Sequence, residues 1–357
     1  MTHGHFTNYH RSFALALFAG TAAAITGCAG GGGSGPASNA NEAGSTSSAP
    51  VVHDVPEAAP KTRDSAANAS LAKAEQLAKS GMLKPALIEF ERAIENNPSL
   101  PQAYIGAAEI YRKQGDYESA SVRYGQAADL TPQSFEPRYS QGLMLQLMHR
   151  LTDAVRAYLK ALEIKPNDFD ANLNIATAYL EMNEPASGLA YAQRAVQINP
   201  KSGPAHANLG SIYGALNRHQ DAVNEYRQAL EQVELSPPLL LNLANSLGKV
   251  GRYDEMVNTL NQVIKIQPSA AAYERMGYAE FKLFKYDEAL KYFRTSVEID
   301  PNYAPGHTGI GVCLLNEYEF SKRQNDAFRA EALTHLRTSV QLDPRQTYVI
   351  DLINKYR

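Results

Sequence analysis

The sequence predicts an all-α solenoid of about eight helix–turn–helix repeats that ends in a capping helix. Three observations support this prediction: a short proline-ending motif recurs about every 34 residues, small residues recur with the same period, and an amphipathic segment follows the last repeat. A fixed period of this length is typical of stacked two-helix units, each of which buries its apolar face against its neighbours.

The N-terminal 27 residues have the pattern of a secretory signal. The apolar run from Phe13 to Ile25 is shorter than the roughly 20 residues that span a bilayer. It leads into Thr26-Gly27-Cys28, and this stretch resembles the lipobox of bacterial lipoproteins. The resemblance implies a signal peptide over 1–27, acyl chains on Cys28 and attachment of the mature protein to a membrane. An ordinary cleaved signal with an incidental Cys28 is the alternative.

The residue after the cysteine is Ala29 rather than Asp. In proteobacterial lipoproteins this implies sorting to the outer membrane, so the resemblance predicts an outer-membrane lipoprotein that faces the periplasm, with surface exposure left open. Residues 28–66 are rich in Gly, Ser, Ala and Pro and predict a flexible linker. About 37 such residues have a root-mean-square reach of about 33 Å. The glycine run lacks the lysine and hydroxyl residue of a phosphate-binding loop.

The repeat period is set by motifs that end at a proline. These prolines are Pro98, Pro132, Pro166, Pro200, Pro268, Pro301 and Pro344. They predict eight repeats over 67–344, namely 67–100, 101–134, 135–168, 169–202, 203–236, 237–269, 270–303 and 304–344. The last repeat contains an insertion at 316–331 that is rich in charge, with Tyr318, Phe320 and Phe328 interleaved. We interpret it either as a solvated helix extension or as a second docking site.

Small residues recur at fixed positions in every repeat. If the terminal proline is numbered 32, position 8 reads Ala74, Ala108, Gly142, Ala176, Gly210, Ala244, Gly277 and Gly311. Position 24 is bulky in seven repeats, as at Phe90, Tyr124 and Phe293, and is Ala192 in the fourth. Small residues that recur at one position predict close contact between helix backbones. One large side chain from each second helix is then expected to fill the remaining space between the helices.

This pattern resembles the tetratricopeptide repeat family, most clearly in the segment from Ala103 to Pro132. The residues that match its motif are Ala108, Tyr111, Gly115, Tyr117, Ala120, Tyr124, Ala127 and Pro132. The resemblance implies a right-handed superhelix whose first helices line a concave groove that binds protein or peptide segments. After the last repeat, 345–357 place Val349, Leu352, Ile353 and Tyr356 on one helical face, which predicts a C-terminal cap.

Composition and motifs argue against several classes of function. The net charge of −3 offers no basic field for nucleic acid, so we predict no nucleic-acid partner. No metal-binding, nucleophile or cofactor motif occurs in a supporting context, and we therefore predict no enzyme activity, no catalytic or metal site and no cofactor. Cys313 is expected to be a buried, inert thiol. His206 and His307, which share one repeat position, are expected to be hydrogen-bonded core histidines.

The groove positions implied by the family contain a ladder of amides. Position 6 reads Asn174, Asn208 and Asn242 in three consecutive repeats, and primary amides can pair with a peptide backbone. A structural role for these asparagines is the alternative. Apolar side chains expected beside the ladder are Tyr139, Leu143, Leu173 and Leu180. The family's carboxylate clamp is incomplete, and the pair Asn245 and Arg275 is kept as a minor anion-binding candidate.

These predictions favour a non-enzymatic, membrane-anchored scaffold that binds a protein segment in its groove. The related lipoproteins imply a role in pilus or secretin assembly, or in recruiting peptidoglycan enzymes. Two alternatives are a substrate-presenting module of a protein glycosyltransferase and a self-associating structural envelope protein. The sequence identifies neither the partner nor the oligomeric state.

Overall fold

The structure is a computed structural model that describes residues 60–232 and 235–357. Within those ranges the chain forms helices and no strands, which confirms the all-α repeat fold. The helices are α1 Pro60–Lys79, α2 Leu83–Asn96, α3 Pro101–Gln114, α4 Tyr117–Leu130, α5 Phe135–Leu147, α6 Leu151–Ile164, α7 Phe169–Glu181, α8 Pro185–Ile198, α9 Gly203–Ala215, α10 His219–Gln232, α11 Pro237–Lys249, α12 Tyr253–Ile266, α13 Ala270–Lys282, α14 Tyr286–Ile299, α15 Ala304–Phe320, α16 Asp326–Leu342 and α17 Thr347–Tyr356. The expected signal peptide, Cys28 and most of the expected linker lie outside the described residues.

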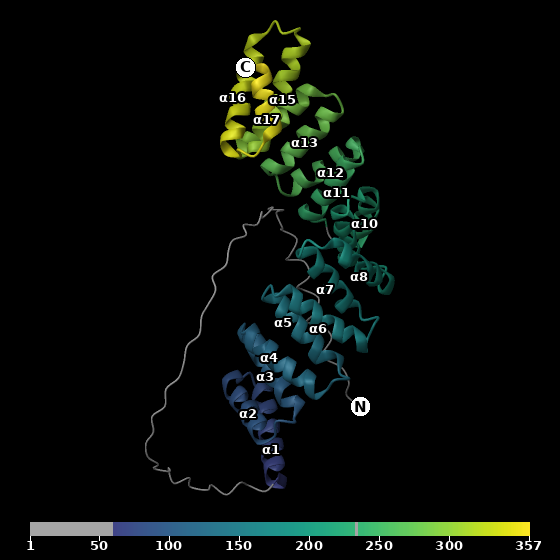
Figure 1. The fold of residues 1–357 in the computed structure, drawn as a ribbon, viewed down its shortest axis with the longest axis vertical. Helices are drawn as coiled ribbons and strands as arrows, with labels where there is room; N and C mark the ends of the chain where they lie inside the picture. Colours follow the sequence, from purple (N-terminus) through teal and green to yellow (C-terminus); the bar gives the residue numbers. More distant parts are fainter. Residues whose placement is uncertain (1–59, 233–234) are drawn as a thin grey trace, which may run out of the picture. The chain divides into compact units, whose positions relative to one another are not determined.

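The described helices fall into two compact units. One contains α1 to α5 and the other begins at His149 and contains α6 to α17. Within each unit, helices form successive hairpins in which the second helix of one repeat also packs on the first helix of the next (Figure 1). The residues at position 8 are buried throughout, as the small-residue column predicts.

The bulky position 24 fills the space between repeats. A Cβ atom built on Gly277 would lie 2.9 Å from Cδ1 of Phe293, and one built on Gly309 would lie 2.2 Å from the same atom. The ring of Phe293 in α14 therefore lies against glycine backbone of its own repeat and of the following repeat. Gly106 makes the corresponding approach to Phe90, with a built Cβ 2.2 Å from Cε1 of that ring. Position 6 is thus a packing position between repeats as well as a surface position.

The first helix of most repeats ends at a residue in the left-handed conformation. These residues are Gly81, Gly115, His149, Asn183, Asn217, Gly251 and Phe284, spaced by the repeat period. A left-handed residue commonly ends a helix because it turns the chain and lets amide groups reach the last carbonyls. Glycine and asparagine adopt this conformation at little cost, and a bulky residue does so at a larger one.

The first helix begins earlier than the sequence predicts. Residues 60–66, assigned to the flexible linker, form the first turns of α1. Proline is tolerated at the start of a helix, and no helix-breaking residue follows Pro60 before the buried Ala67. Asn97 donates a hydrogen bond to Asp64 over 2.8 Å, which ties this extension to the end of the first repeat. The linker prediction therefore ended seven residues too late.

The insertion in the eighth repeat lengthens both of its helices. α15 and α16 each have 17 residues, whereas α13 has 13 and α14 has 14. Tyr318 becomes buried and Phe328 packs on the core of this repeat, but Phe320 stays exposed. The helix extension expected for this segment is therefore present.

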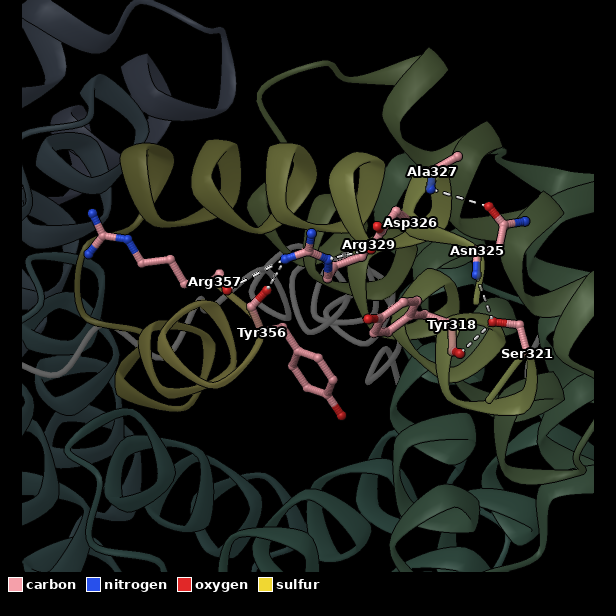
Figure 2. Close-up of polar contacts among 8 residues, drawn as sticks. All are labelled: Tyr318, Ser321, Asn325, Asp326, Ala327, Arg329, Tyr356 and Arg357. Carbon is pink, nitrogen blue, oxygen red and sulfur yellow. Dashed lines mark hydrogen bonds and ion pairs between the residues drawn. The ribbon is translucent and has the colours of Figure 1, made fainter. Parts of the chain in front are cut away.

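The C-terminal cap is confirmed. Val349 is buried among the core residues of the eighth repeat, and Leu352, Ile353 and Tyr356 pack on the same core. Arg329 of α16 donates to the carbonyl of Tyr356 over 3.3 Å, and Tyr356 Oη donates to Glu319 over 2.7 Å (Figure 2 shows Arg329 directed at the last residues of the chain). Among the helices described here, none is long and apolar enough to cross a membrane.

Candidate functional site

The surface that the repeat pattern assigns to binding lies on the first helices of the repeats. In the second unit these are α7, α9, α11, α13 and α15, and α9 contacts both α7 and α11. Position 6 places Asn174 on α7, Asn208 on α9 and Asn242 on α11. The three asparagines therefore lie on three neighbouring helices, but their environments differ.

Asn208 is a brace between repeats. Its side chain is only 1% exposed, and its Nδ2 donates to Thr177 Oγ1 over 2.9 Å. Thr177 in turn donates to the carbonyl of Leu173 over 2.9 Å, which fixes the direction of both hydrogen bonds. The Oδ1 atom of Asn208 is buried and lacks a hydrogen-bond partner in the part of the chain that is described. Because no ligand reaches a buried amide directly, the structural alternative applies to Asn208.

Asn174 and Asn242 differ from Asn208 because both are half-buried and keep contact with solvent. Asn245 follows Asn242 by three residues on α11 and is exposed. Residues three apart lie on the same side of a helix, so Asn242 and Asn245 present two amide groups from one face. The usable part of the ladder is therefore this pair on α11, together with Asn174 on α7.

The residues of the expected apolar lining contribute to the core to different degrees. Leu173 is 8% exposed and packs with Ala195 and Ala205, and Leu180 packs on the central core of the second unit. In the first unit, Leu143 packs on the cluster around Tyr124. The expectation that these leucines line an open surface is corrected for Leu173, which the repeat interface covers, whereas Leu143 and Leu180 are only partly buried. Tyr139 is half-buried and stacks on Phe135, with ring centroids 5.4 Å apart.

The candidate anion-binding pair has a competing charge. Arg275 on α13 is half-buried and interacts electrostatically with the neighbouring Glu274. Burial raises the pKa of Glu274, and the positive charge of Arg275 acts in the opposite direction. Glu274 already partly compensates the positive charge of Arg275. An external anion would therefore bind there with less favourable electrostatic energy than at a guanidinium without a neighbouring carboxylate.

The structure adds an aromatic residue that the sequence interpretation missed. Tyr278 occupies position 9 of the seventh repeat and is 39% exposed. Its ring makes an edge contact with Tyr253 at 6.2 Å, and Lys282 Nζ lies 5.5 Å from its ring centre. A Cβ atom built on Gly248 of α11 would lie 4.0 Å from Cε1 of Tyr278, so the ring reaches across to α11. Its position in a groove column was the signal that could have identified it.

The two histidines behave as predicted, and they reveal a repeated brace. At position 4, the side chains of Asn172, His206 and His307 each pair with the carbonyl of the proline that ends the preceding repeat, over 3.1, 2.9 and 2.9 Å. His206 also contacts Glu225 over 2.6 Å. Both histidines are buried and hydrogen-bonded, which confirms their assignment to the core. Cys313 is buried as expected, and burial raises the pKa of its thiol to about 12.

A histidine pair in the eighth repeat predicts a pH dependence of stability. Pro301 can only accept, so His307 Nε2 carries a proton and its Nδ1 accepts from His335 Nδ1 over 2.9 Å. Burial lowers the pKa of His335, as do the charges of His307 and Arg294, while Glu331 raises it. The unfolded chain thus binds a proton first, near pH 6.5, and stability falls as the pH decreases below that value.

We expect the stability advantage of the native protein over a His335→Asn variant to shrink between pH 7.5 and pH 5.5. Urea titrations of both proteins at several pH values measure this difference. An advantage that is constant, or that grows on acidification, would contradict the prediction.

No group of three or more metal-ligating side chains occurs within the described part of the chain. The candidate surface presents amides, an aromatic ring and lysines. Asn242, Asn245 and Tyr278 can hydrogen-bond and pack against a bound chain, and the exposed Lys249 and Lys282 add positive charge.

Comparisons with known proteins identify the repeat. Models of the tetratricopeptide repeat match residues 71–135, 157–190, 203–232, 237–269 and 270–303, which together are more than half of the chain. A search of the curated proteins gives no match.

The chain is also similar to several solved structures. A tetratricopeptide repeat protein from Parabacteroides merdae is 20% identical, with a TM-score of 0.50 over 73% of this chain and 99% of that one. YrrB, described as a TPR protein with an unusual peptide-binding site, is 21% identical, with a TM-score of 0.45 over 56% of this chain and 98% of that one. PilF from Pseudomonas aeruginosa is 17% identical, with a TM-score of 0.47 over 59% and 96%. The chain belongs to the tetratricopeptide repeat family.

Proposed function

We propose that this protein is a non-enzymatic scaffold that holds an extended segment of a partner protein on the first-helix face of α11 and α13. The observation that carries the proposal is the solvent contact of Asn242, Asn245 and Tyr278, in contrast to the burial of Asn208 one repeat earlier. Each amide offers both donors and an acceptor to a peptide backbone. Tyrosine adds a rigid apolar surface with a polar tip, which is a frequent feature of binding hot spots.

The charges on this face indicate which segments it would select. Lys249 and Lys282 are exposed at the C-terminal ends of α11 and α13, whereas the nearby Glu274 is half-buried. A partner segment with acidic side chains would be attracted to this end, because complementary charge increases the rate and specificity of association.

We further propose that acyl chains on Cys28 tether the scaffold to the outer membrane, facing the periplasm. The lipobox-like sequence before Cys28 supports this proposal. Pilus or secretin assembly and recruitment of peptidoglycan enzymes are the processes in which such a tethered scaffold would act.

A crosslinking pull-down from intact cells tests the proposed peptide surface. We expect Asn242→Ala with Asn245→Ala to reduce capture of the partner roughly 10- to 30-fold, because each lost hydrogen bond contributes about 1 kcal/mol. The matched control is Asn258→Ala with Asn261→Ala, two exposed asparagines on α12 of the same repeat. Equal capture by both double variants would exclude the α11 face. Metabolic labelling with a fatty acid tests the tether separately: the native protein should incorporate the label and a Cys28→Ser variant should not, and an unlabelled native protein would exclude the tether.

A further inference from the structure

An exposed phenylalanine occupies a strained turn between α13 and α14. Phe284 has a φ angle of 63° and is 78% exposed. The corresponding turn residues are glycine, asparagine or histidine in the first six repeats, and these residues adopt positive φ more readily. In the turn of the eighth repeat, Lys322 and Arg323 have positive φ. Neither backbone geometry nor burial favours phenylalanine at this position. Such an outlier is a reason to look for a function.

The ring of Phe284 belongs to an aromatic cluster that joins two turns. Tyr286 is at its centre, with ring-centroid distances of 5.1 Å to Phe281, 6.3 Å to Phe284 and 5.7 Å to Phe320. Phe320 ends the extended helix α15 and is 63% exposed. The insertion of the eighth repeat therefore brings a second exposed ring to the turn that carries Phe284. We call these four rings the aromatic turn cluster.

Cations accompany the aromatic turn cluster. The segments 282–286 and 320–325 contain Lys282, Lys285, Lys322 and Arg323 and no carboxylate, and all four cations are exposed. Glu319 pairs with Arg323 at 3.0 Å, and the buried Glu280 lies 3.3 Å from Lys285. Asp287 and Glu288 follow in the first turn of α14. Lys285 and Arg323 are therefore partly neutralised by the paired carboxylates, and Lys282 and Lys322 carry the remaining positive charge of the two turn tips.

We propose that the aromatic turn cluster binds the surface of a membrane that contains anionic phospholipids. Aromatic rings are favoured at the level of lipid headgroups, and each nearby lysine or arginine is attracted to an anionic surface. Phe284 and Phe320 would enter the headgroup region while Lys282 and Lys322 contact lipid phosphates. This contact shares Lys282 with the proposed peptide surface but uses none of Asn242, Asn245 and Tyr278, and it does not require a lipid on Cys28.

The sequence has no tryptophan, so a single introduced tryptophan reports on its own surroundings. The test uses the full chain with Cys28→Ser and Phe284→Trp, mixed with vesicles of phosphatidylglycerol that carry brominated acyl chains. We expect a blue shift and quenching of the tryptophan emission, and little change with phosphatidylcholine alone. The matched control is Tyr348→Trp on α17, an aromatic position that is 62% exposed and lies outside the cluster.

Equal quenching at positions 284 and 348 would overturn the proposal, because another part of the chain would then bring the whole protein to the vesicle. Unchanged emission at position 284 would also overturn it. In that case, a discrete protein adduct from a photoreactive residue at position 284 in cells would identify a protein as the partner.

A second variant separates binding from folding. Phe284→Asn relieves the strain of the turn and is expected to raise the unfolding midpoint. Quenching of Phe320→Trp in the same chain should then require a roughly tenfold higher concentration of anionic lipid, since burial of one phenylalanine in an apolar phase is worth about this factor or more. A lower midpoint with unchanged lipid dependence would assign Phe284 a structural role and overturn the proposal.

Discussion

Replacing Phe293 by alanine is expected to lower the free energy of unfolding by about 3–5 kcal/mol. Phe293 is 5% exposed and belongs to the core that joins the seventh and eighth repeats. Its ring lies against the backbone at Gly277 and Gly309. Because glycine has no side chain, neither residue can fill the cavity that the substitution leaves. The cost should therefore include both the lost burial and an open cavity.

Urea denaturation and hydrogen exchange together measure this loss and locate it. In a solenoid each repeat contacts only its neighbours, so exchange should accelerate in α13 to α16 and remain unchanged in α1 to α4. Phe320→Ala is the matched control, because it removes a ring of the same size from an exposed position and should change stability by less than about 0.5 kcal/mol. A loss below about 1 kcal/mol for Phe293→Ala would contradict the assigned packing.

The repeat register could be predicted from the sequence because it depends on periodic features of single positions. The small residues at position 8 are buried, and the capping residues around Val349 pack as their spacing indicates. The start of α1 could not be predicted, because residues 62–66 are exposed and carry no apolar signal.

The environment of each ladder asparagine could not be predicted from its own column. Position 6 faces position 24 of the preceding repeat, as the close approach of Gly309 to Phe293 shows. Position 24 of the preceding repeat is Tyr158 for Asn174 and Tyr226 for Asn242. For Asn208 it is the small residue Ala192. A small residue at position 24 leaves room for the amide of Asn208 to be buried between the two repeats. Burial of Asn208 is therefore a property of two residues in different repeats.

The aromatic turn cluster also could not be predicted from the sequence pattern. Tyr286 and Phe320 come from different repeats, and their contact at 5.7 Å depends on the length of α15. Repeat columns describe what the repeats share, whereas Phe284 and the insertion are departures from the repeat. The candidate peptide surface and the candidate membrane surface both arise where individual residues depart from the column average.

Replacing Gly309 by alanine is expected to destabilise the protein by about 1–3 kcal/mol, although alanine is normally the better helix residue. The added Cβ would lie 2.2 Å from Cδ1 of Phe293, so the ring or the α15 backbone must move. Gly214→Ala in α9 is the matched control, because the nearest atom to its Cβ is Tyr226 Oη at 3.9 Å. With that space available, the control should gain about 0.5–1 kcal/mol.

Thermal and urea unfolding of the two variants give opposite signs if position 6 is a packing position between repeats. A double-mutant cycle strengthens the test, because Phe293→Ala removes the atoms that the new methyl group would meet. Gly309→Ala should then cost less in the Phe293→Ala background than in the native protein, with a coupling of at least about 0.5 kcal/mol. Additive effects would show that the two residues do not share a contact, and position 6 would then be free to serve binding alone. Coupled effects would mean that Gly309 is constrained by the preceding repeat before any partner is bound.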